Sequence, residues 1–262
     1  MAEGIKWHNA AIQDELVPKK SPLEFKLPDS AKELVFMAKL TEEAERYDEM
    51  VLCMRKLVKL NSELDTEERN LLSMAYKNVI GSRRNAWRII TSIESRESAR
   101  EKSENLQLIA SLRKEFEAEL AAICDDLLAL LDMYLIPASQ GGEVKVFYLK
   151  MKGDYHRYYA EIAPEAGQRQ AALDAYAKAT EVANSSLAST HPIRLGLALN
   201  FSVFYYEIMK EHEKGFQLAR QAYDEAVTEL ETLDDEAYRE SNLIVRLLRD
   251  NLNLWTDEQP SS

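Results

Sequence analysis

The sequence predicts an all-α protein, and three properties of the chain support this prediction. Only 8 Gly and 7 Pro occur among 262 residues, a composition that favours long helices over many short strands joined by turns. Apolar residues make up 46% of the chain, enough for a sizeable core in one large domain or two small ones. Several long segments repeat apolar residues at helical spacing. We therefore expect a bundle of about nine helices whose sequential neighbours are antiparallel, because their connections are short.

The N-terminal segment differs from the rest of the chain. Pro18, Pro22 and Pro28 fall close together and predict an extended connector. The segment has scattered charge and no apolar core of the length that a signal peptide needs. We expect a flexible extension over residues 1–29, a helical domain over 30–257 and a short tail over 258–262.

The first half of the domain is expected to hold several long helices. Residues 29–136 contain no proline and a single glycine, Gly81. Glu33 lies three residues after Ser30, as in a capping box. The candidate N-terminal caps are Asp29 or Ser30 for the first helix and Asp65 or Thr66 for a later one.

The second half follows a loop expected at 137–144. Five amphipathic runs come after that loop, at 145–162, 169–187, 193–211, 214–230 and 236–255, with a turn at 189–192. Paired helices can indicate a tetratricopeptide solenoid, but no self-similarity recurs near the roughly 34-residue period of that repeat. A single bundle is therefore favoured over a repeat array.

Composition also limits partners and compartment. A formal net charge of −12 argues against a general nucleic-acid-binding protein. No run reaches the roughly 18 apolar residues that a membrane span needs, so we expect no membrane association. Cys53 and Cys124 are too few to staple a chain of this size and lie in apolar helical surroundings. We expect a cytoplasmic protein with buried, reduced thiols.

The familiar motifs of catalytic and metal sites are missing from the sequence. The four histidines form no HExxH or ExxH pair, and no CxxC, GxGxxG, GxxxxGK or GxSxG motif occurs. We therefore expect no catalytic residues, no metal and no cofactor. An enzyme of the helical-bundle metal class is disfavoured by the missing ExxH pairs.

One helix carries a cationic stripe that is unusual in so acidic a chain. Placed on a helix, Lys77, Arg84 and Arg88 fall within about 40° of one another, and no carboxylate shares their face. The opposite face is apolar and consists of Leu71, Ala75, Val79, Ala86, Ile89 and Ile93. A solvated polar face is the ordinary interpretation of such a stripe. The lack of acidic partners at i,i+4 instead suggests that an anion binds there.

A second cationic cluster lies in the run at 145–162. Lys150 and Arg157 are seven residues apart on one face, Asp154 lies between them, and Tyr158 follows. Arg is suited to a bidentate grip on a phosphoryl group, and a tyrosine hydroxyl adds a neutral donor. We expect Arg84 and Arg157 to form a pair of clamps on a surface that packs against nothing.

Two further helices place polar side chains beside apolar ones. Asn200 and Glu207 are two turns apart with Val203 between them, and Leu243, Leu247, Asn251 and Trp255 step by four. Such stripes are ordinarily core. An unpaired buried amide costs roughly 1–3 kcal/mol, however, so amides that bind a peptide backbone would explain both stripes.

Four stretches resemble the signature regions of one family. They are "RNLLSMAYKNVIGSRRNAWRIITSIE" (69–94), "KVFYLKMKGDYHRYYAEI" (145–162), "THPIRLGLALNFSVFYYEI" (190–208) and "YRESNLIVRLLRDNLNLWTD" (238–257). Together they resemble the 14-3-3 family over about 30–257. The resemblance implies a nine-helix antiparallel bundle that dimerises and binds phosphoserine or phosphothreonine peptides in an amphipathic groove.

The resemblance also assigns roles to particular residues. It implies a phosphate pocket at Lys77, Arg84, Arg157 and Tyr158, with Lys150 alongside. It implies peptide-backbone contacts at Asn200, Glu207, Asn251 and Trp255, and an apolar wall at Leu199, Val203, Leu243, Ile244 and Leu247. Arg246 stands where the family usually has a glutamine and adds a cation beside the groove.

A homodimer is implied in the same way. Its interface falls on Leu40, Ala44, Arg46, Ala86, Leu112 and Glu119. Arg46 is expected to pair with Glu119 across the interface, whereas Glu49 faces Glu115 where the family has an acid–lysine pair. Because like charges repel, we expect a weaker dimer than is usual for the family.

We therefore expect an adaptor that docks client proteins phosphorylated on serine or threonine and regulates them, without a catalytic step. A phosphoryl group carries about −1.5 to −2 charges, so its presence can decide whether a client binds. The alternative is a helical-repeat scaffold that binds unmodified peptides. That scaffold would bind a peptide and its phosphorylated form equally well.

Overall fold

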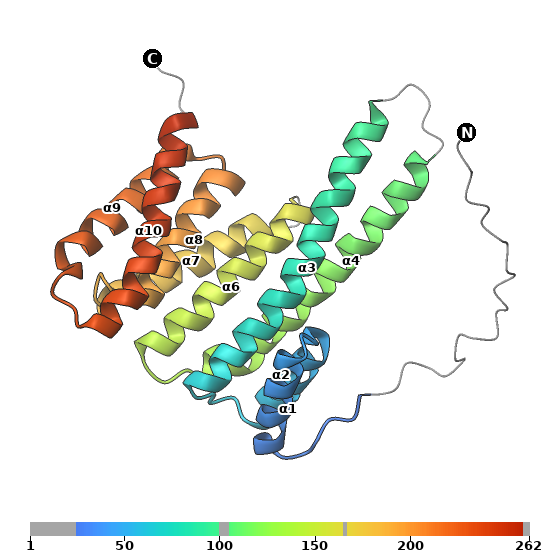
Figure 1. Ribbon diagram of the computed structural model, residues 1–262, viewed down its shortest axis with the longest axis horizontal. Helices are drawn as coiled ribbons and strands as arrows, with labels where there is room; N and C mark the ends of the chain where they lie inside the picture. Colours follow the sequence, from blue (N-terminus) through green and yellow to red (C-terminus); the bar gives the residue numbers. More distant parts are fainter. Residues whose placement is uncertain (1–24, 100–104, 165–166, 259–262) are drawn as a thin grey trace, which may run out of the picture.

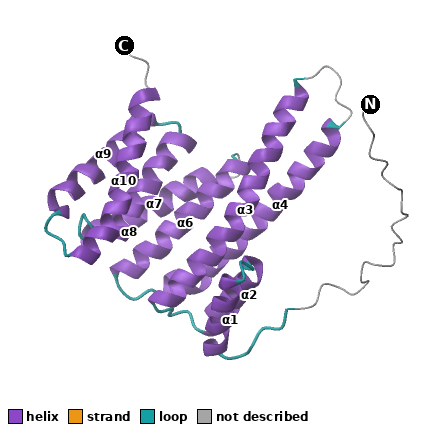
Figure 2. Ribbon diagram, viewed as in Figure 1, coloured by secondary structure: helices purple, strands orange, loops and turns teal. Residues whose placement is uncertain are grey.

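A computed structural model describes residues 25–99, 105–164 and 167–258 of the chain. These residues form nine long helices and no strand, which confirms the predicted all-α class (Figures 1 and 2). The nine are α1 (Ala31–Glu43), α2 (Tyr47–Leu60), α3 (Thr66–Ser98), α4 (Leu106–Leu130), α6 (Gly142–Ile162), α7 (Gln168–Ser186), α8 (Pro192–Val203), α9 (His212–Leu230) and α10 (Asp235–Glu258).

Two of the helices continue through a π-helical turn. Leu131–Leu135 extends α4 toward the short α5 (Ile136–Ala138), and Phe204–Ile208 extends α8. Of the expected extension, residues 1–24 lie outside the described part of the chain, as do residues 259–262 of the expected tail. No helix in the described ranges is long and apolar enough to cross a membrane.

Sequential helices pack against each other, as the short connections predict. The pairs α1 and α2, α3 and α4, α6 and α7, and α9 and α10 are in extensive contact. Figure 1 shows α3 and α4 as a long pair, with α1 and α2 against one end and α7 to α10 on the other side of α6. The central helix α6 therefore joins the two halves of the bundle, and it also contacts α4 and α8.

The local sequence explains where the first helices begin. Asp65 caps α3 in a complete capping box, because its carboxylate accepts from the Glu68 N–H (2.8 Å) and the Glu68 carboxylate accepts from the Asp65 N–H (3.0 Å). Ser30 caps α1 through its hydroxyl, which accepts from the Glu33 N–H at 3.3 Å. Of the candidate caps, Ser30 and Asp65 are thus the residues used.

Residues 25–29 are held against the first helices. Phe25 and Leu27 pack on the core cluster that α1 to α4 form together with α6. Lys56 of α2 donates to the Leu27 carbonyl at 3.5 Å and to the Asp29 carboxylate at 2.6 Å. This part of the expected extension is therefore anchored to the bundle.

The packing of α7 on α6 positions the polar groups described below. Gly153 of α6 lies against the ring of Tyr176 of α7, and a Cβ added at Gly153 would lie 2.6 Å from that ring. The ring is fully buried and stacks on Phe201 of α8 with centroids 5.1 Å apart. Because residue 153 has no side chain, the Tyr176 hydroxyl can reach polar groups on α6.

Candidate functional site

A pocket of about 360 Å³ opens between α3, α6 and α8. Lys77 lines it from α3, Lys150, Arg157 and Tyr158 line it from α6, and Asn200 lines it from α8. The structure thus brings together residues that are up to 123 positions apart in the chain. Arg84 borders the same pocket, because its guanidinium lies 4.1 Å from the ring centroid of Tyr158.

The carboxylate of Asp154 organises the α6 side of the pocket. Lys150 Nζ donates to its Oδ2 at 2.8 Å, and Asn200 Nδ2 donates to its Oδ1 at 2.7 Å. The Tyr176 hydroxyl donates to the same Oδ1 at 2.6 Å, and Arg157 Nη2 lies 3.6 Å from it. Asp154 therefore links three helices through one buried side chain.

The cations beside Asp154 keep it ionised although it is buried. Burial acts to raise the pKa of Asp154, but the charges of Lys150 and Arg157 and the hydrogen bonds from Lys150 and Tyr176 outweigh it. The pKa of Asp154 is consequently held below its ordinary value. Burial and the neighbouring Asp154 charge raise the pKa of Tyr176, so its hydroxyl remains a donor.

Arg84 is held by a carboxylate from the neighbouring helix. Its Nε and Nη2 donate to the two oxygens of Glu161 at 3.2 and 2.5 Å, and Arg88 Nη2 donates to Glu161 Oε2 at 3.3 Å. The Arg157 guanidinium also lies over the ring of Tyr158, 4.6 Å from its centroid. Tyr158 and Glu161 thus orient the two arginines that the sequence singles out as clamps.

The expectation that Arg84 and Arg157 lie on a surface that packs against nothing is wrong for both residues. Arg157 is only 7% exposed, and its Nε donates to the Tyr176 hydroxyl at 3.2 Å. Arg84 is half-buried against Glu161. Lys77 is exposed and makes no hydrogen bond or ion pair with the residues that the structure describes. The periodicity of one helix cannot show acids that a neighbouring helix supplies.

The apolar face expected on the same helix is buried only in its N-terminal part. Leu71, Ala75 and Val79 belong to the core, whereas Ile89 is 54% exposed. In Figure 1 the C-terminal part of α3 runs with α4 away from α1 and α2. No residue of α3 after Ile80 is buried by the other described residues.

The pocket carries a surplus of positive charge. Its four cations, Lys77, Arg84, Lys150 and Arg157, face two carboxylates, Asp154 and Glu161. Two positive charges therefore remain uncompensated in a chain whose net charge is −12. The charge and the guanidinium donors of this arrangement are of the kind that suits a divalent oxyanion.

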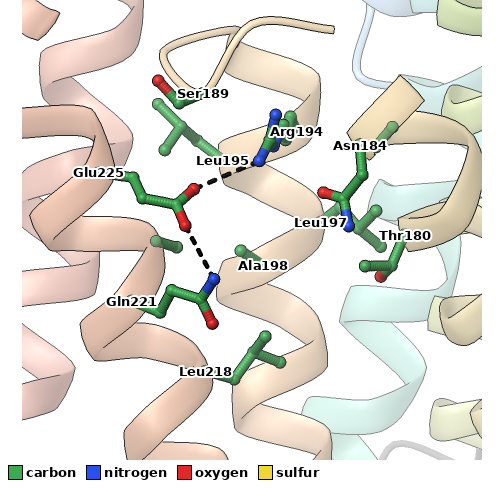
Figure 3. A pocket seen from close by; sticks show the side chains of 12 residues that line it. Thr180, Asn184, Ser189, Arg194, Leu195, Leu197, Ala198, Leu218, Gln221 and Glu225 are labelled. Carbon is green, nitrogen blue, oxygen red and sulfur yellow. Dashed lines mark hydrogen bonds and ion pairs between the residues drawn. The ribbon is translucent and has the colours of Figure 1, made fainter. Parts of the chain in front are cut away.

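Another pocket differs from this one because its charged side chains are paired with each other. A smaller pocket of about 110 Å³ lies between α7, α8 and α9 (Figure 3). Its one arginine, Arg194, donates to Glu225 at 3.2 Å and to the Leu187 carbonyl at 2.9 Å, and Gln221 donates to Glu225 at 2.8 Å. Because its charges are balanced internally, this pocket offers no comparable attraction for an anion.

The expected wall and amide positions lie on α8 and α10. Leu199, Val203 and Ile244 are partly buried and pack on the core cluster formed by α8, α9 and α10. Leu243 and Leu247 are 65% and 45% exposed on α10, beside half-buried Asn251 and exposed Arg246. Leu243 and Leu247 thus leave apolar surface exposed on α10, which packs against α8.

Two expected peptide contacts lie differently from the others. Trp255 is only 3% exposed, and its ring stacks on Tyr206 with centroids 4.3 Å apart. Glu207 is exposed and lines a separate hollow together with Arg88. The structure therefore groups Asn200 with the expected phosphate-pocket residues. Glu207 lies about two turns further along the chain, in the π-helical turn that continues α8.

Sequence reasoning missed Glu161 and Tyr176. Glu161 lies four residues after Arg157, a helical spacing that could have indicated an acidic residue near the cationic cluster. No local signal distinguishes Tyr176, since its role depends on how α7 packs on Gly153.

Comparison with known proteins agrees with the resemblance. The family model described as 14-3-3 protein matches residues 37–256. The 14-3-3 family protein artA of Aspergillus flavus is 57% identical over 230 residues, which cover 87% of this chain and 97% of that protein. The 14-3-3-like protein GF14 iota of Arabidopsis thaliana is 56% identical, covering 86% and 85% of the two chains. Protein BMH1 of Saccharomyces cerevisiae is 54% identical, covering 89% of each.

Replacing Asp154 should test its role as the organising group. We expect Asp154→Asn to lower the free energy of unfolding at pH 7 by about 3–5 kcal/mol, because it leaves buried Arg157 without its carboxylate. Urea denaturation followed by circular dichroism measures the change. The control Asp224→Asn breaks the exposed pair with Arg220 on α9 and should change stability by at most about 0.5 kcal/mol.

The difference in unfolding free energy between wild type and Asp154→Asn should also depend on pH. Because folding lowers the pKa of Asp154, its stabilising contribution is complete above the unfolded value of about 3.9 and is lost as the pH falls through the folded value. The difference between wild type and Asp154→Asn should therefore shrink below about pH 4. An equal difference at pH 7 and pH 3 would show that the Asp154 charge is not what stabilises the fold.

Proposed function

The chain belongs to the 14-3-3 family, and from that premise we propose that it binds phosphoserine and phosphothreonine peptides in the pocket between α3, α6 and α8. Proteins of this family are adaptors that bind client proteins, and they are not enzymes. We infer in addition that this chain recognises the phosphorylated residue of its client. The regulation of those clients is part of the same proposal.

The surplus charge of the pocket is the observation that supports this proposal. A phosphoryl group carries about −1.5 to −2 charges at neutral pH, which matches the two uncompensated positive charges of the pocket. Lys77 has no ionic partner among the described residues. The Tyr158 hydroxyl likewise makes no hydrogen bond with them. Both donors are therefore available to phosphate oxygens.

Arg84 and Arg157 would contribute in different ways. Arg157 is fixed by Asp154 and Tyr176, so it presents its charge without further ordering. Arg84 is shared with Glu161, and a phosphoryl group competes with that carboxylate for its guanidinium. Charge-assisted hydrogen bonds contribute roughly 1.5–3 kcal/mol each, so several such bonds can make binding depend on phosphorylation.

The rest of a client peptide would lie along α8 and α10. Asn251 makes no hydrogen bond with the described residues, so its amide can bind a peptide backbone. The exposed side chains of Leu243 and Leu247 offer apolar contacts beside it. Asn200 uses one amide hydrogen on Asp154 and keeps its remaining donor and oxygen.

We also propose a homodimer formed through α1, α3 and α4. Large apolar side chains are exposed there in the protomer: Phe36 (63%), Leu40 (49%), Ile89 (54%), Leu108 (70%) and Leu112 (38%). Exposed apolar groups of this extent are typical of association surfaces. Ala44 is exposed and Ala86 half-buried on the same helices or at their ends.

The charges near this surface are partly paired within the protomer. Arg46 forms an ion pair with Glu49, and Glu119 lies 3.6 Å from Arg83. Arg46 thereby neutralises the charge that we expected to repel Glu115 across the interface. The same pairs also engage Arg46 and Glu119, which we expected to attract each other across the interface, so both the expected repulsion and the expected attraction are reduced.

A cytoplasmic location is part of the proposal. Cys53 and Cys124 are both free and buried, and burial raises the pKa of the Cys53 thiol to about 11 and that of Cys124 to about 12. Protonated, unpaired thiols suit a reducing compartment.

Phosphate dependence can be tested at Lys77, which is exposed and packs against little. We expect Lys77→Glu to weaken binding of a phosphoserine peptide at least about tenfold, because it replaces a phosphate donor with a repelling carboxylate. Fluorescence polarisation with a labelled peptide measures the affinity, and thermal circular dichroism checks the fold. Arg157→Glu is less suitable because it would bury an unpaired carboxylate.

The matched control is Lys178→Glu, an exposed lysine of α7 that pairs with Glu181 and should leave affinity unchanged. Wild type should not bind the unphosphorylated peptide measurably. Equal affinity for the phosphorylated and the unphosphorylated peptide would instead support a helical-repeat scaffold that binds unmodified peptides. Undiminished binding of the phosphoserine peptide by Lys77→Glu would rule out this pocket.

The dimer can be tested by placing a charge on its apolar surface. Leu112→Asp should shift the protein toward monomer in sedimentation equilibrium, because the carboxylate would have to lose its water in the interface. Met133→Asp alters a residue that is 63% exposed in the π-helical turn after α4, 21 residues from Leu112, and should leave the dimer intact. A monomeric wild type, or a dimer unaffected by Leu112→Asp, would contradict the proposal.

A further inference from the structure

The pocket of about 110 Å³ between α7, α8 and α9 has an apolar floor and a polar mouth (Figure 3). Ala183, Leu195 and Leu197 are buried at its floor. Asn184 of α7 and Gln221 of α9 are exposed at its mouth. A hollow that is mainly apolar and carries a few polar groups is the usual form of a small-molecule site in proteins.

Small side chains on three helices leave this space open. Ala183 of α7, Ala198 of α8 and Ala222 of α9 all line the pocket, although α8 packs on both α7 and α9. Each alanine leaves room that a larger side chain would fill with favourable contacts. The pocket is therefore already formed in the protein, and a ligand need not displace a side chain to enter it.

The mouth carries unused hydrogen-bonding groups of both kinds. The side-chain amide of Asn184 makes no hydrogen bond with the described residues. Gln221 donates one N–H to Glu225 at 2.8 Å and keeps its other N–H and its carbonyl oxygen. Figure 3 shows these two amides on opposite sides of Ala198. A ligand that has a donor beside an acceptor can therefore bind to both α7 and α9.

The charged side chains of the pocket balance each other. Among the described residues that line it, only Arg194 and Glu225 are charged, and they form an ion pair at 3.2 Å. A second hydrogen bond, to the Leu187 carbonyl at 2.9 Å, holds the Arg194 guanidinium in place. Neither an anion nor a cation would find an unpaired opposite charge among these residues. Because taking a charge out of water without such a partner is costly, the pocket favours an uncharged ligand.

The volume of the pocket sets the size of that ligand. An apolar cavity of about 150 Å³ accommodates benzene, so about 110 Å³ with an open mouth accommodates one ring whose substituent reaches outward. We propose that this pocket binds a small uncharged ring compound that carries a carboxamide or a cyclic amide. The ring lies on the apolar floor, and the amide lies at the mouth between Asn184 and Gln221.

This site is separate from the phosphate pocket, although both use α8. Gly196 and Asn200 line the phosphate pocket, whereas Arg194, Leu195 and Ala198 line this one. Successive residues of a helix are about 100° apart around its axis, so the two sets lie on different faces of α8. The inference therefore does not rest on the proposed function, and its failure would leave that proposal standing.

The experiment uses benzamide as the probe, because it is an uncharged ring with a primary amide. We expect the full chain to bind benzamide with a Kd of about 0.1–1 mM, the range for a ligand of about nine non-hydrogen atoms. NMR of protein labelled at its leucine and alanine methyl groups measures the binding and locates it. The methyl signals that should shift belong to residues lining the pocket: Ala183, Leu195, Leu197, Ala198, Leu218 and Ala222. Leu57, buried in the core of the other half of the bundle, should not shift.

Three analogues of the same size test the chemistry of the ligand. Benzoate carries a negative charge and benzylamine a positive one, and each should bind at least about threefold more weakly than benzamide because its charge is left without a partner. Toluene has no polar group, and it should also bind at least about threefold more weakly because it makes no hydrogen bond at the mouth.

Two variants test the position of the ligand, each with a matched control. Ala198→Leu fills the space of the ring and should weaken benzamide binding at least about tenfold, whereas Ala177→Leu, at an exposed position of α7, should not change it. Asn184→Ala should weaken benzamide binding about three- to fivefold and leave toluene unaffected. Its control is Gln217→Ala, which removes an exposed amide from α9 and should have no effect.

Thermal circular dichroism should show that Ala198→Leu is folded, and if it is not, Asn184→Ala decides alone because its side chain is exposed. The inference would be overturned if benzamide shifted no methyl signal of the pocket or if a charged analogue bound as tightly as benzamide. Unchanged benzamide affinity in a folded Ala198→Leu or in Asn184→Ala, or an equal loss in their controls, would also overturn it.

Discussion

A buried carboxylate surrounded by cations is the constraint on which the site depends. Without Asp154, the charges of Lys150 and Arg157 would repel each other across about two turns of α6. With it, both side chains are fixed, and Tyr176 and Asn200 tie α7 and α8 to the same oxygen atoms. Because one carboxylate contacts both Lys150 and Arg157, it fixes both side chains and neutralises only one of their two positive charges. The fold therefore holds a concentrated positive charge at little conformational cost on binding.

Glu161 has a complementary role at the other side of the pocket. It joins Arg84 and Arg88. A ligand that takes Arg84 leaves Glu161 to Arg88 alone. The same carboxylate prevents Arg84 from extending freely into solvent, which reduces the entropy lost when an anion binds.

Much of this organisation could be predicted from the sequence, and the rest required the packing of helices. The scarcity of glycine and proline predicted the all-α bundle, and the capping signals at Ser30 and Asp65 predicted where α1 and α3 begin. Helical periodicity placed Lys77, Arg84 and Arg88 on one face. It could not show that Glu161 of α6 pairs with two of them, that Arg157 is buried, or that Tyr176 reaches Asp154 past Gly153, because each depends on a neighbouring helix.

Asp154 and Glu161 leave the pocket with a surplus of about two positive charges, and the ionisation of the bound ligand measures that surplus directly. The second pKa of a phosphoserine is about 6 in a free peptide. A surplus of positive charge favours the dianion, so this pKa should fall when the peptide binds. A ³¹P NMR titration of a saturated complex, compared with the free peptide, should show the lowered value. An unchanged or raised value would contradict the account.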